Sequence, residues 1–245
     1  MSDTKALGES EGTRTVNGEF EYLGKGIYSI PEAARLTRLT SGQIRRWVRP
    51  RSSTAATSDR RPPIVAPDFE VIDSRLSLSF LDLIEVLFVK SFRSYGVSWK
   101  AIRTASQSAS RLLDSNHPFA QRRFFTDGID ILTRIGEEQT ERELMNLVRS
   151  QYEFDEIVAP LLYENLDFGE LDLARRWWPG GRSRDIIVDP HLNLGKPVVA
   201  RYNIPTSVLY QLYLSQSSSS KVADWYEIDE EAVVAAVDFE AGLAA

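Results

Sequence analysis

Two short segments near the N-terminus carry apolar residues at helical spacing. The first covers residues 30–36 and has Pro31 in its opening turn, where a helix tolerates proline. The second covers residues 41–49, begins after Thr40, which is a good N-cap, and is stopped by Pro50. The tight connection between the two segments predicts a helix-turn-helix.

The next elements alternate between strand and helix patterns. β-branched residues in two short runs between residues 64 and 78 predict a small β-hairpin. Apolar residues then return at helical spacing, in a helix that Ser79 caps and Gly96 ends. Ser98 can cap a further helix over residues 99–113.

The middle of the chain has a less regular pattern. The pair Asp127-Gly128 lies between residues 122–126 and 129–135 and predicts another β-hairpin. Residues 138–152 have a clear apolar face and predict an amphipathic helix.

The C-terminal part combines strands and helices. Residues 175–178 and 185–188 predict strands around a Pro-Gly-Gly turn, and helices are expected after Thr206 and over residues 222–226 and 230–240. We therefore expect an α+β fold that is mainly α. It would have a small β-hairpin and strands in the middle and a three-helix, helix-turn-helix-like module at the C-terminus.

Composition excludes several classes of protein. The 245 residues are 42% hydrophobic and 26% charged, which is typical of a folded protein. The absence of cysteine excludes disulfides, thiolate metal sites and cysteine nucleophiles. The first 26 residues have no apolar core of a signal peptide. The longest apolar stretch, residues 80–89, is about half the ~20 residues that a membrane span requires and contains Asp82 and Glu85. We expect a cytoplasmic protein.

Charge becomes informative when it is counted by segment. The whole chain has a net charge of −6, which argues against a nucleic-acid binder. However, residues 27–61 contain eight arginines and two acids, a net +6. Residues 127–173 carry −10, residues 174–201 carry +4, and residues 221–245 carry −6. This asymmetry indicates separate tasks for separate segments.

The stretch from Tyr28 to Trp47 reads Tyr-Ser-Ile-Pro-Glu-Ala-Ala-Arg-Leu-Thr-Arg-Leu-Thr-Ser-Gly-Gln-Ile-Arg-Arg-Trp. It resembles the opening of MerR-type winged helix-turn-helix regulators. The resemblance continues at residues 80–86 and 95–102, where that family has a helix, a Gly-hydrophobic-Ser turn and the next helix. It implies a winged helix-turn-helix DNA-binding domain over residues 25–114.

A helix that enters the major groove needs hydrogen-bonding side chains at its N-terminal end and cations beside the phosphates. Gln43 with Arg45 or Arg46 could reach base edges, and the other arginines are better placed for phosphates. The alternative is a solvated arginine face on an ordinary helical domain. The candidate DNA-binding residues are Arg35, Thr40, Ser41, Gln43, Arg45, Arg46, Arg49, Arg60, Arg61 and, as a wing contact, Arg75.

The C-terminal part resembles a second family. Residues 185–199 and 223–239, with an Ile-Pro pair between them, are similar to the bacterial domain of unknown function 433. That domain is found in antitoxins paired with PIN-like ribonuclease toxins. Where the family usually has Arg-Gly-Thr-Arg, residues 200–203 read Ala-Arg-Tyr-Asn. Residues 117–128 and 175–179 also resemble the middle of VapB-type antitoxins of this two-module kind.

The combined resemblance implies an antitoxin of a type II pair. It would neutralise a PIN-like ribonuclease toxin and, as a homodimer, regulate its own operon by binding double-stranded operator DNA. Acidic segments could cover the cationic surface of such a toxin. The candidate toxin-binding residues are Trp177, Trp178, Lys196, Arg201, Tyr202, Glu230 and Glu231. The expected parts are a disordered lead (1–24), the DNA-binding domain (25–114), a connecting β-hairpin with acidic helices (115–180) and an antitoxin-type module (181–245).

Two other classes of function stay open. The first is a MerR-like regulator that responds to a small ligand in a cavity lined by residues such as Trp177, Trp178 and Tyr202. The second is an enzyme acting on nucleic acid, which would need three convergent acids with a metal. We expect no enzyme, cofactor, metal or catalytic residue. His117 and His191 stand in ordinary turns, and no nucleophile elbow or phosphate loop is found.

Overall fold

The two short helices predicted near the N-terminus are confirmed in the computed structural model, which describes residues 24–49, 62–71, 75–139, 165–169 and 171–244. Helix α1 covers Ile30–Thr37 and helix α2 covers Ser41–Val48. Each begins at a capping box, which Ser29 forms in α1 and Thr40 forms in α2. These boxes satisfy N–H groups that the first turn leaves without intrahelical partners.

The β-hairpin predicted within residues 64–78 is wrong in the described part of that segment. Strand β2, Ser77–Leu78, pairs antiparallel with β1, Tyr28–Ser29, rather than with the residues just before it. The N–H of Ile64 instead donates to the carbonyl of Trp47 at 2.8 Å. The segment thereby satisfies a carbonyl at the C-terminal end of α2, which a helix leaves free.

The two longer helices are confirmed together with their caps. Helix α3 covers Phe80–Ser94, begins at the capping residue Ser79 and ends before Gly96, which has φ +81°. Helix α4 covers Trp99–Leu113 and begins at Ser98. Buried residues surround α3, because it is the central helix of the first hydrophobic core.

The hairpin predicted around Asp127-Gly128 is also wrong. The short helix η2 covers Pro118–Ala120, and the helices α5 and α6 cover Arg122–Thr126 and Gly128–Glu138. Apolar residues spaced three, four and seven apart enter the core here, and this helical period outweighs the turn preference of an Asp-Gly pair. These buried residues are Phe124, Ile131, Leu132 and Ile135.

Two further small sheets follow in the described residues. The strand predicted at residues 175–178 is confirmed one residue earlier, and the strand predicted at residues 185–188 is confirmed in shortened form. They belong to different sheets, joined by a bridge between Trp177 and Val188. All pairings are antiparallel. The strands are β3 (Leu166–Phe168) with β4 (Ala174–Trp177), and β5 (Ile186–Ile187) with β6 (Val198–Val199) and β7 (Ile204–Pro205).

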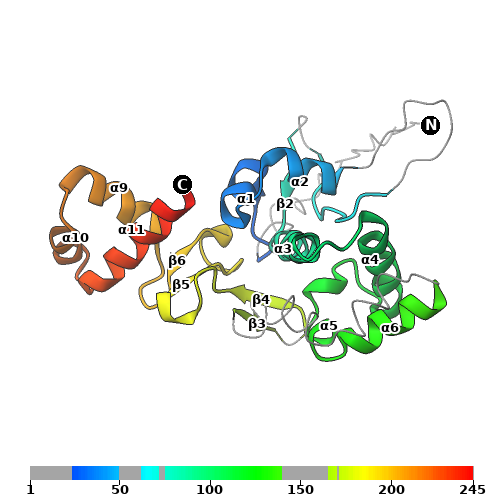
Figure 1. Cartoon of the computed structure of the whole chain (residues 1–245). Helices are drawn as coiled ribbons and strands as arrows, with labels where there is room; N and C mark the ends of the chain where they lie inside the picture. Colours follow the sequence, from blue (N-terminus) through cyan, green and yellow to red (C-terminus); the bar gives the residue numbers. More distant parts are fainter. Residues whose placement is uncertain (1–23, 50–61, 72–74, 140–164, 170, 245) are drawn as a thin grey trace, which may run out of the picture.

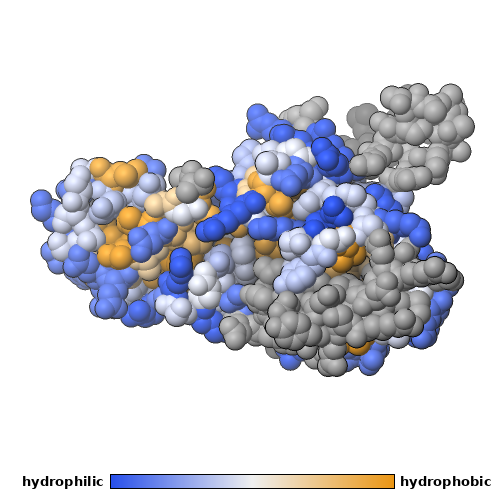
Figure 2. Space-filling view, viewed as in Figure 1, coloured by the Kyte–Doolittle hydropathy of each residue, from blue (hydrophilic) through white to orange (hydrophobic). Residues whose placement is uncertain are grey.

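Three helices close the chain, as predicted. Helix α9 covers Thr206–Gln216, α10 covers Ser219–Tyr226 and α11 covers Glu230–Ala244. The serine run before α10 supplies its cap, because the Ser218 hydroxyl accepts from the N–H of Lys221. Figure 2 shows apolar residues gathered on the surface of these C-terminal helices.

The described chain has two hydrophobic cores. The first contains buried residues from Tyr28 to Val188, and the second contains residues from Ile186 to Phe239. Leu36 of α1 packs against both cores. Figure 1 shows the resulting elongated shape, with α9–α11 at one end, α4–α6 at the other, and the N-terminal helices between them.

The expected fold class is confirmed, since the protein is α+β and mainly helical. No helix of the described residues is long and apolar enough to cross a membrane. The expected lead over residues 1–24 and helix over residues 138–152 lie almost wholly outside the described residues, and so do Arg60 and Arg61.

Candidate nucleic-acid and protein-binding surfaces

Helix α2 turns one face to the core and the other to solvent. Ile44 and Trp47 are buried, with 0% and 3% exposed surface. Gln43, Arg45 and Arg46 are exposed on the opposite side, and Ser41 in the first turn is half-buried. The side chains proposed to read base edges therefore share the solvent face of one helix.

The capping box of α2 limits what two candidate residues can do. The side-chain oxygen Oε1 of Gln43 accepts from the Thr40 N–H at 2.9 Å and lies 3.0 Å from the Thr40 hydroxyl oxygen. That hydroxyl accepts from the N–H of Gln43 at 3.1 Å. Thr40 is thus engaged in positioning the helix, while the amide NH₂ of Gln43 stays available as a donor to a base or phosphate.

Three of the candidate arginines come together at one groove. Arg45 and Arg49 from α2 and Arg75 next to β2 line a hollow of about 490 Å³, which also includes Pro31 of α1. All three arginines are exposed. Within the described residues, their side chains form no ion pair or hydrogen bond. Glu32 of α1 lines the same groove, which therefore has three arginines against one acid and a net positive charge.

Arg35 has a different environment from these arginines. Its guanidinium donates to a carboxylate oxygen of Glu240 in α11 at 2.9 Å. The Glu240 side chain is 7% exposed, and its other oxygen accepts from the Thr206 hydroxyl at 2.5 Å. Arg35 is therefore a link between the two cores and is not free to neutralise a phosphate.

The two candidate tryptophans are not equivalent. Trp177 is 5% exposed and belongs to the first core, so it cannot form a contact surface. Trp178 is half-buried, and its indole N–H donates to Asp167 at 3.1 Å. The guanidinium of Arg182 lies 5.2 Å from the Trp178 ring centre and donates to the same Asp167 at 2.6 Å.

Four other candidate residues lie together on the C-terminal module. Arg201 donates to Asp185 at 2.8 Å and to Asp229 at 3.1 Å, and the Tyr202 hydroxyl donates to Asp229 at 2.7 Å. Arg201, Glu230 and Glu231 line one groove of about 600 Å³. Lys196 is exposed but lines a separate cavity beside Arg35 and Glu240. Asp229 belongs to the acidic tail expected to face a toxin, whereas Asp185 and Glu240 are not among the candidates, although Glu240 continues the buried helical spacing of Val233, Ala236 and Phe239.

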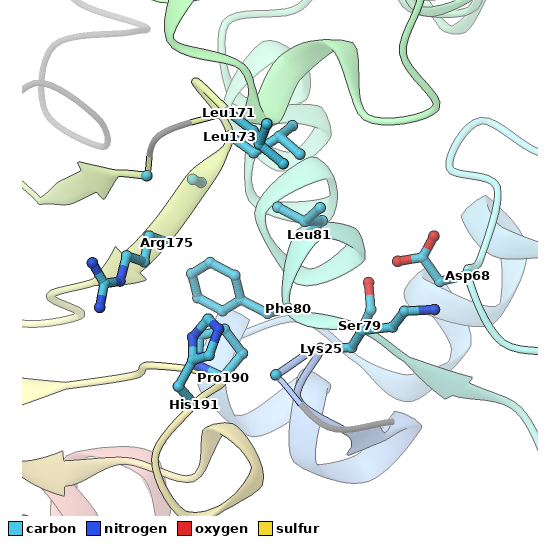
Figure 3. Close-up of a pocket in the computed structure, with 13 residues that line it drawn as sticks. Lys25, Asp68, Ser79, Phe80, Leu81, Leu171, Leu173, Arg175, Pro190 and His191 are labelled. Atoms are coloured by element: carbon cyan, nitrogen blue, oxygen red, sulfur yellow. The ribbon is translucent and has the colours of Figure 1, made fainter. Parts of the chain in front are cut away.

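A further cavity of about 450 Å³ lies between the N-terminal segment, α3 and the β3–β4 hairpin (Figure 3). Lys25 and Arg175 lie on opposite sides of it, with Phe80 between them and His191 nearby. Neither Trp177, Trp178 nor Tyr202 lines this cavity. The ligand-binding alternative therefore has a cavity in the described residues, but with a different lining from the one expected.

Comparison with known proteins finds a family that matches part of the chain and a solved structure with a similar fold. Residues 186–239 match the family described as "Protein of unknown function (DUF433)". No curated protein matches the chain. The crystal structure of Rv2018 from Mycobacterium tuberculosis has a similar fold, with a TM-score of 0.69 and 22% sequence identity over 86% of this chain and 97% of that chain. The expected C-terminal domain is thus supported, and the likeness to Rv2018 extends over both cores.

Proposed function

We propose that this protein is an antitoxin of a type II toxin–antitoxin pair. It binds its operator DNA through the N-terminal helices as a cytoplasmic homodimer, and it neutralises a PIN-like ribonuclease through its C-terminal module. The observation that carries the DNA-binding half is the set of exposed arginines on and beside α2 that form no ion pair within the described part of the chain: Arg45, Arg46, Arg49 and Arg75.

The arrangement of these arginines fits a DNA backbone better than a solvated helix face. Cations on a solvated helix face can pair with acids on neighbouring turns, as Arg134 does with Glu138 at 2.8 Å in α6. Arg45, Arg49 and Arg75 have no such acid among their described partners and converge on one groove from two parts of the chain. Phosphate contacts of this kind supply most of the affinity of a DNA-binding protein.

Two observations support the antitoxin half. The first is the match of residues 186–239 to the DUF433 family. The resemblance of the C-terminal part to this domain implies an antitoxin. The second is the exposed pair Glu230 and Glu231 at the start of α11, next to the fixed Arg201. Acidic side chains on a well-ordered surface can complement the cationic substrate-binding surface of a ribonuclease.

The DNA-binding proposal is tested by titrating the full chain with DNA from upstream of its own gene. The variant combines Arg45→Ala, Arg49→Ala and Arg75→Ala, and Arg134→Ala is the control because Arg134 is exposed but paired on α6. Each lost phosphate contact should reduce the slope of log affinity against log salt by about 0.9, so the triple variant should lose about 2.7. An unchanged slope, or no binding of the unmodified protein at low salt, would refute this half.

The antitoxin proposal is tested by co-expression with the protein encoded next to this gene. We expect a complex and rescue of growth, and loss of both with Glu230→Lys plus Glu231→Lys. The control has the same charge change at the N-terminal end of α6, Asp127→Lys plus Asp130→Lys. Failure of the unmodified chain to bind or rescue contradicts the proposal, as does equal loss in the control.

A ligand-responsive regulator is a second candidate, and the cavity in Figure 3 favours it. Its apolar floor and the cations Lys25 and Arg175 suit a small apolar acid. A rise in melting temperature with aromatic carboxylic acids, abolished by Arg175→Ala and retained in Arg134→Ala, would support this function.

A further inference from the structure

Four titratable side chains meet in the interior next to α3. Asp82 and Glu85, one turn apart on α3, are 0% and 2% exposed. His117 precedes η2, and Asp68 comes from the segment that follows α2. The ligand atoms of Asp68, Asp82 and His117 all lie within 4.8 Å of one another. Segments up to 49 residues apart in the sequence therefore converge on one small polar site.

Most of the polar atoms in this site have identified partners. Asp82 Oδ2 accepts from the N–H groups of Ser79 at 2.8 Å and Asp68 at 3.1 Å. Glu85 Oε1 accepts from the N–H groups of Phe119 and Ala120 at 2.7 and 3.1 Å. These bonds fix the carboxylates by backbone contacts and leave little freedom for them to rearrange.

Among the described residues, two buried side-chain atoms have no hydrogen-bond partner, Asp82 Oδ1 and His117 Nδ1. They face each other at 3.8 Å, which is longer than the ~2.7–3.2 Å of a hydrogen bond. His117 Nε2 lies 2.9 Å from Asp68 Oδ1, so a neutral ring that donates from Nε2 presents a lone pair at Nδ1. Two electron pairs then point at each other, and either a proton or a metal cation between them would relieve the repulsion.

The geometry meets several requirements of a metal site. Zinc bonds to imidazole nitrogen and carboxylate oxygen are each about 2.0–2.2 Å, so one ion can bridge the 3.8 Å gap slightly off the line between the two atoms. A ligating histidine usually donates its other N–H to a carboxylate, which Asp68 provides. Asp68 and Ser79 also line the cavity in Figure 3, so the polar cluster lies next to that cavity.

The charge balance of the site also favours a bound cation. Three carboxylates, Asp68, Asp82 and Glu85, surround a single imidazole. Asp82 and Glu85 are buried, so a negative charge on either is costly without a compensating cation. A proton competes with a metal ion for His117 Nδ1, because the ligand must be neutral to bind the metal.

We propose that Asp82 Oδ1 and His117 Nδ1 bind a first-row divalent metal ion of the zinc type, with Asp68 orienting His117 and cavity water completing the coordination. The ion has a structural role, because Asp82 and Glu85 are buried and cannot reach a nucleic-acid substrate. It ties the segment after α2 and the η2 turn to α3, and so stabilises the core that supports the helix-turn-helix. This inference does not depend on the proposed DNA or toxin binding.

The test is calorimetric titration of the metal-stripped full chain with ZnCl₂, and with CoCl₂ for its visible absorption. The variants are His117→Gln, which keeps a donor toward Asp68, and Asp82→Asn. The control is His191→Ala, because His191 is the other histidine of the chain and is exposed. We expect one tightly bound metal ion in the unmodified protein and in the control, and affinity about 100-fold lower or undetectable in the two variants.

Imidazole ¹⁵N NMR of the unmodified protein gives an answer that does not depend on the folding of any variant. Zinc should shift the Nδ1 signal of His117 and leave its Nε2 signal that of a protonated nitrogen. The proposal is overturned if His117 is an imidazolium whose signals do not change with zinc, or if His117→Gln binds zinc as tightly as the unmodified chain. It is also overturned if His191→Ala removes the binding.

Discussion

The contact between α1 and α11 allows a quantitative test of how the two cores are held together. Arg35 and Glu240 form an ion pair of 2.9 Å across this interface, and the two partners differ in burial. The Arg35 side chain is 53% exposed, whereas Glu240 is 7% exposed and also accepts from Thr206. The perturbations are Arg35→Ala, Glu240→Gln and the double variant.

The difference in burial fixes the expected magnitudes. Removal of one partner of a buried pair typically costs about 3–5 kcal/mol because the other charge is left uncompensated. Since half of Arg35 is in water, we expect Arg35→Ala to cost about 2 kcal/mol. With Gln at position 240 no buried charge remains, so the same Arg35 change should then cost less than about 0.5 kcal/mol. The expected coupling is therefore about 1.5 kcal/mol.

The assay is equilibrium urea unfolding of all four proteins, followed by far-ultraviolet circular dichroism and tryptophan fluorescence. The free energies form a double-mutant cycle, which isolates the pairwise energy. The coupling should persist in 1 M salt, because salt screens a buried pair weakly. If Arg35→Ala costs the same with Glu and with Gln at position 240, or if salt removes the coupling, the pair is an ordinary surface contact and the reasoning is wrong.

Three other predictions concern single sites. Gly195→Ala should cost about 3 kcal/mol or more in urea unfolding, because Gly195 has φ +84° and a Cβ there would lie 2.2 Å from the Tyr28 hydroxyl oxygen; a neutral effect would contradict this packing. Trp177→Ala should cost about 3–5 kcal/mol through loss of core packing, and stability equal to that of the unmodified chain would place this side chain on the surface. Bonds from Arg182 and Trp178 lower the pKa of Asp167 although desolvation opposes them. The stabilisation that Asp167 gives relative to Asp167→Asn should therefore be present above about pH 4 and be lost as pH falls through the lowered pKa. The check is the melting temperature of the unmodified chain and of Asp167→Asn, measured from pH 3 to 7. Parallel curves of melting temperature against pH would contradict this prediction.

Helices with explicit start signals are predicted well from this sequence, and short strands are not. Thr40, Ser79 and Ser98 each cap the helix expected of them, because an N-cap acts through backbone groups two or three residues away. Strand pairing depends on distant partners. Ser77–Leu78 pairs with Tyr28–Ser29, and nothing in the local pattern of either segment identifies the other.

The polar cluster next to α3 shows the same limit at the level of a site. Asp82 and Glu85 are visible in the sequence as two acids within an apolar helix, and that pattern excludes a membrane span. It does not reveal that His117 and Asp68 approach them. Two acids on the buried side of a helix are nevertheless a usable signal, because burial of charge requires a partner.

Counting charge by segment locates a basic region but does not show which arginines are free. Arg35 and Arg45 contribute equally to the +6 of residues 27–61. In the structure, Arg35 is paired with Glu240, which lies 205 residues away in the sequence. Arg45 forms no ion pair within the described residues, although Glu32 lines the same groove. An arginine can neutralise a phosphate at little cost only if it does not have to break a contact within the protein. The tertiary fold therefore divides one basic segment into structural arginines and available ones, and DNA affinity should follow the second group.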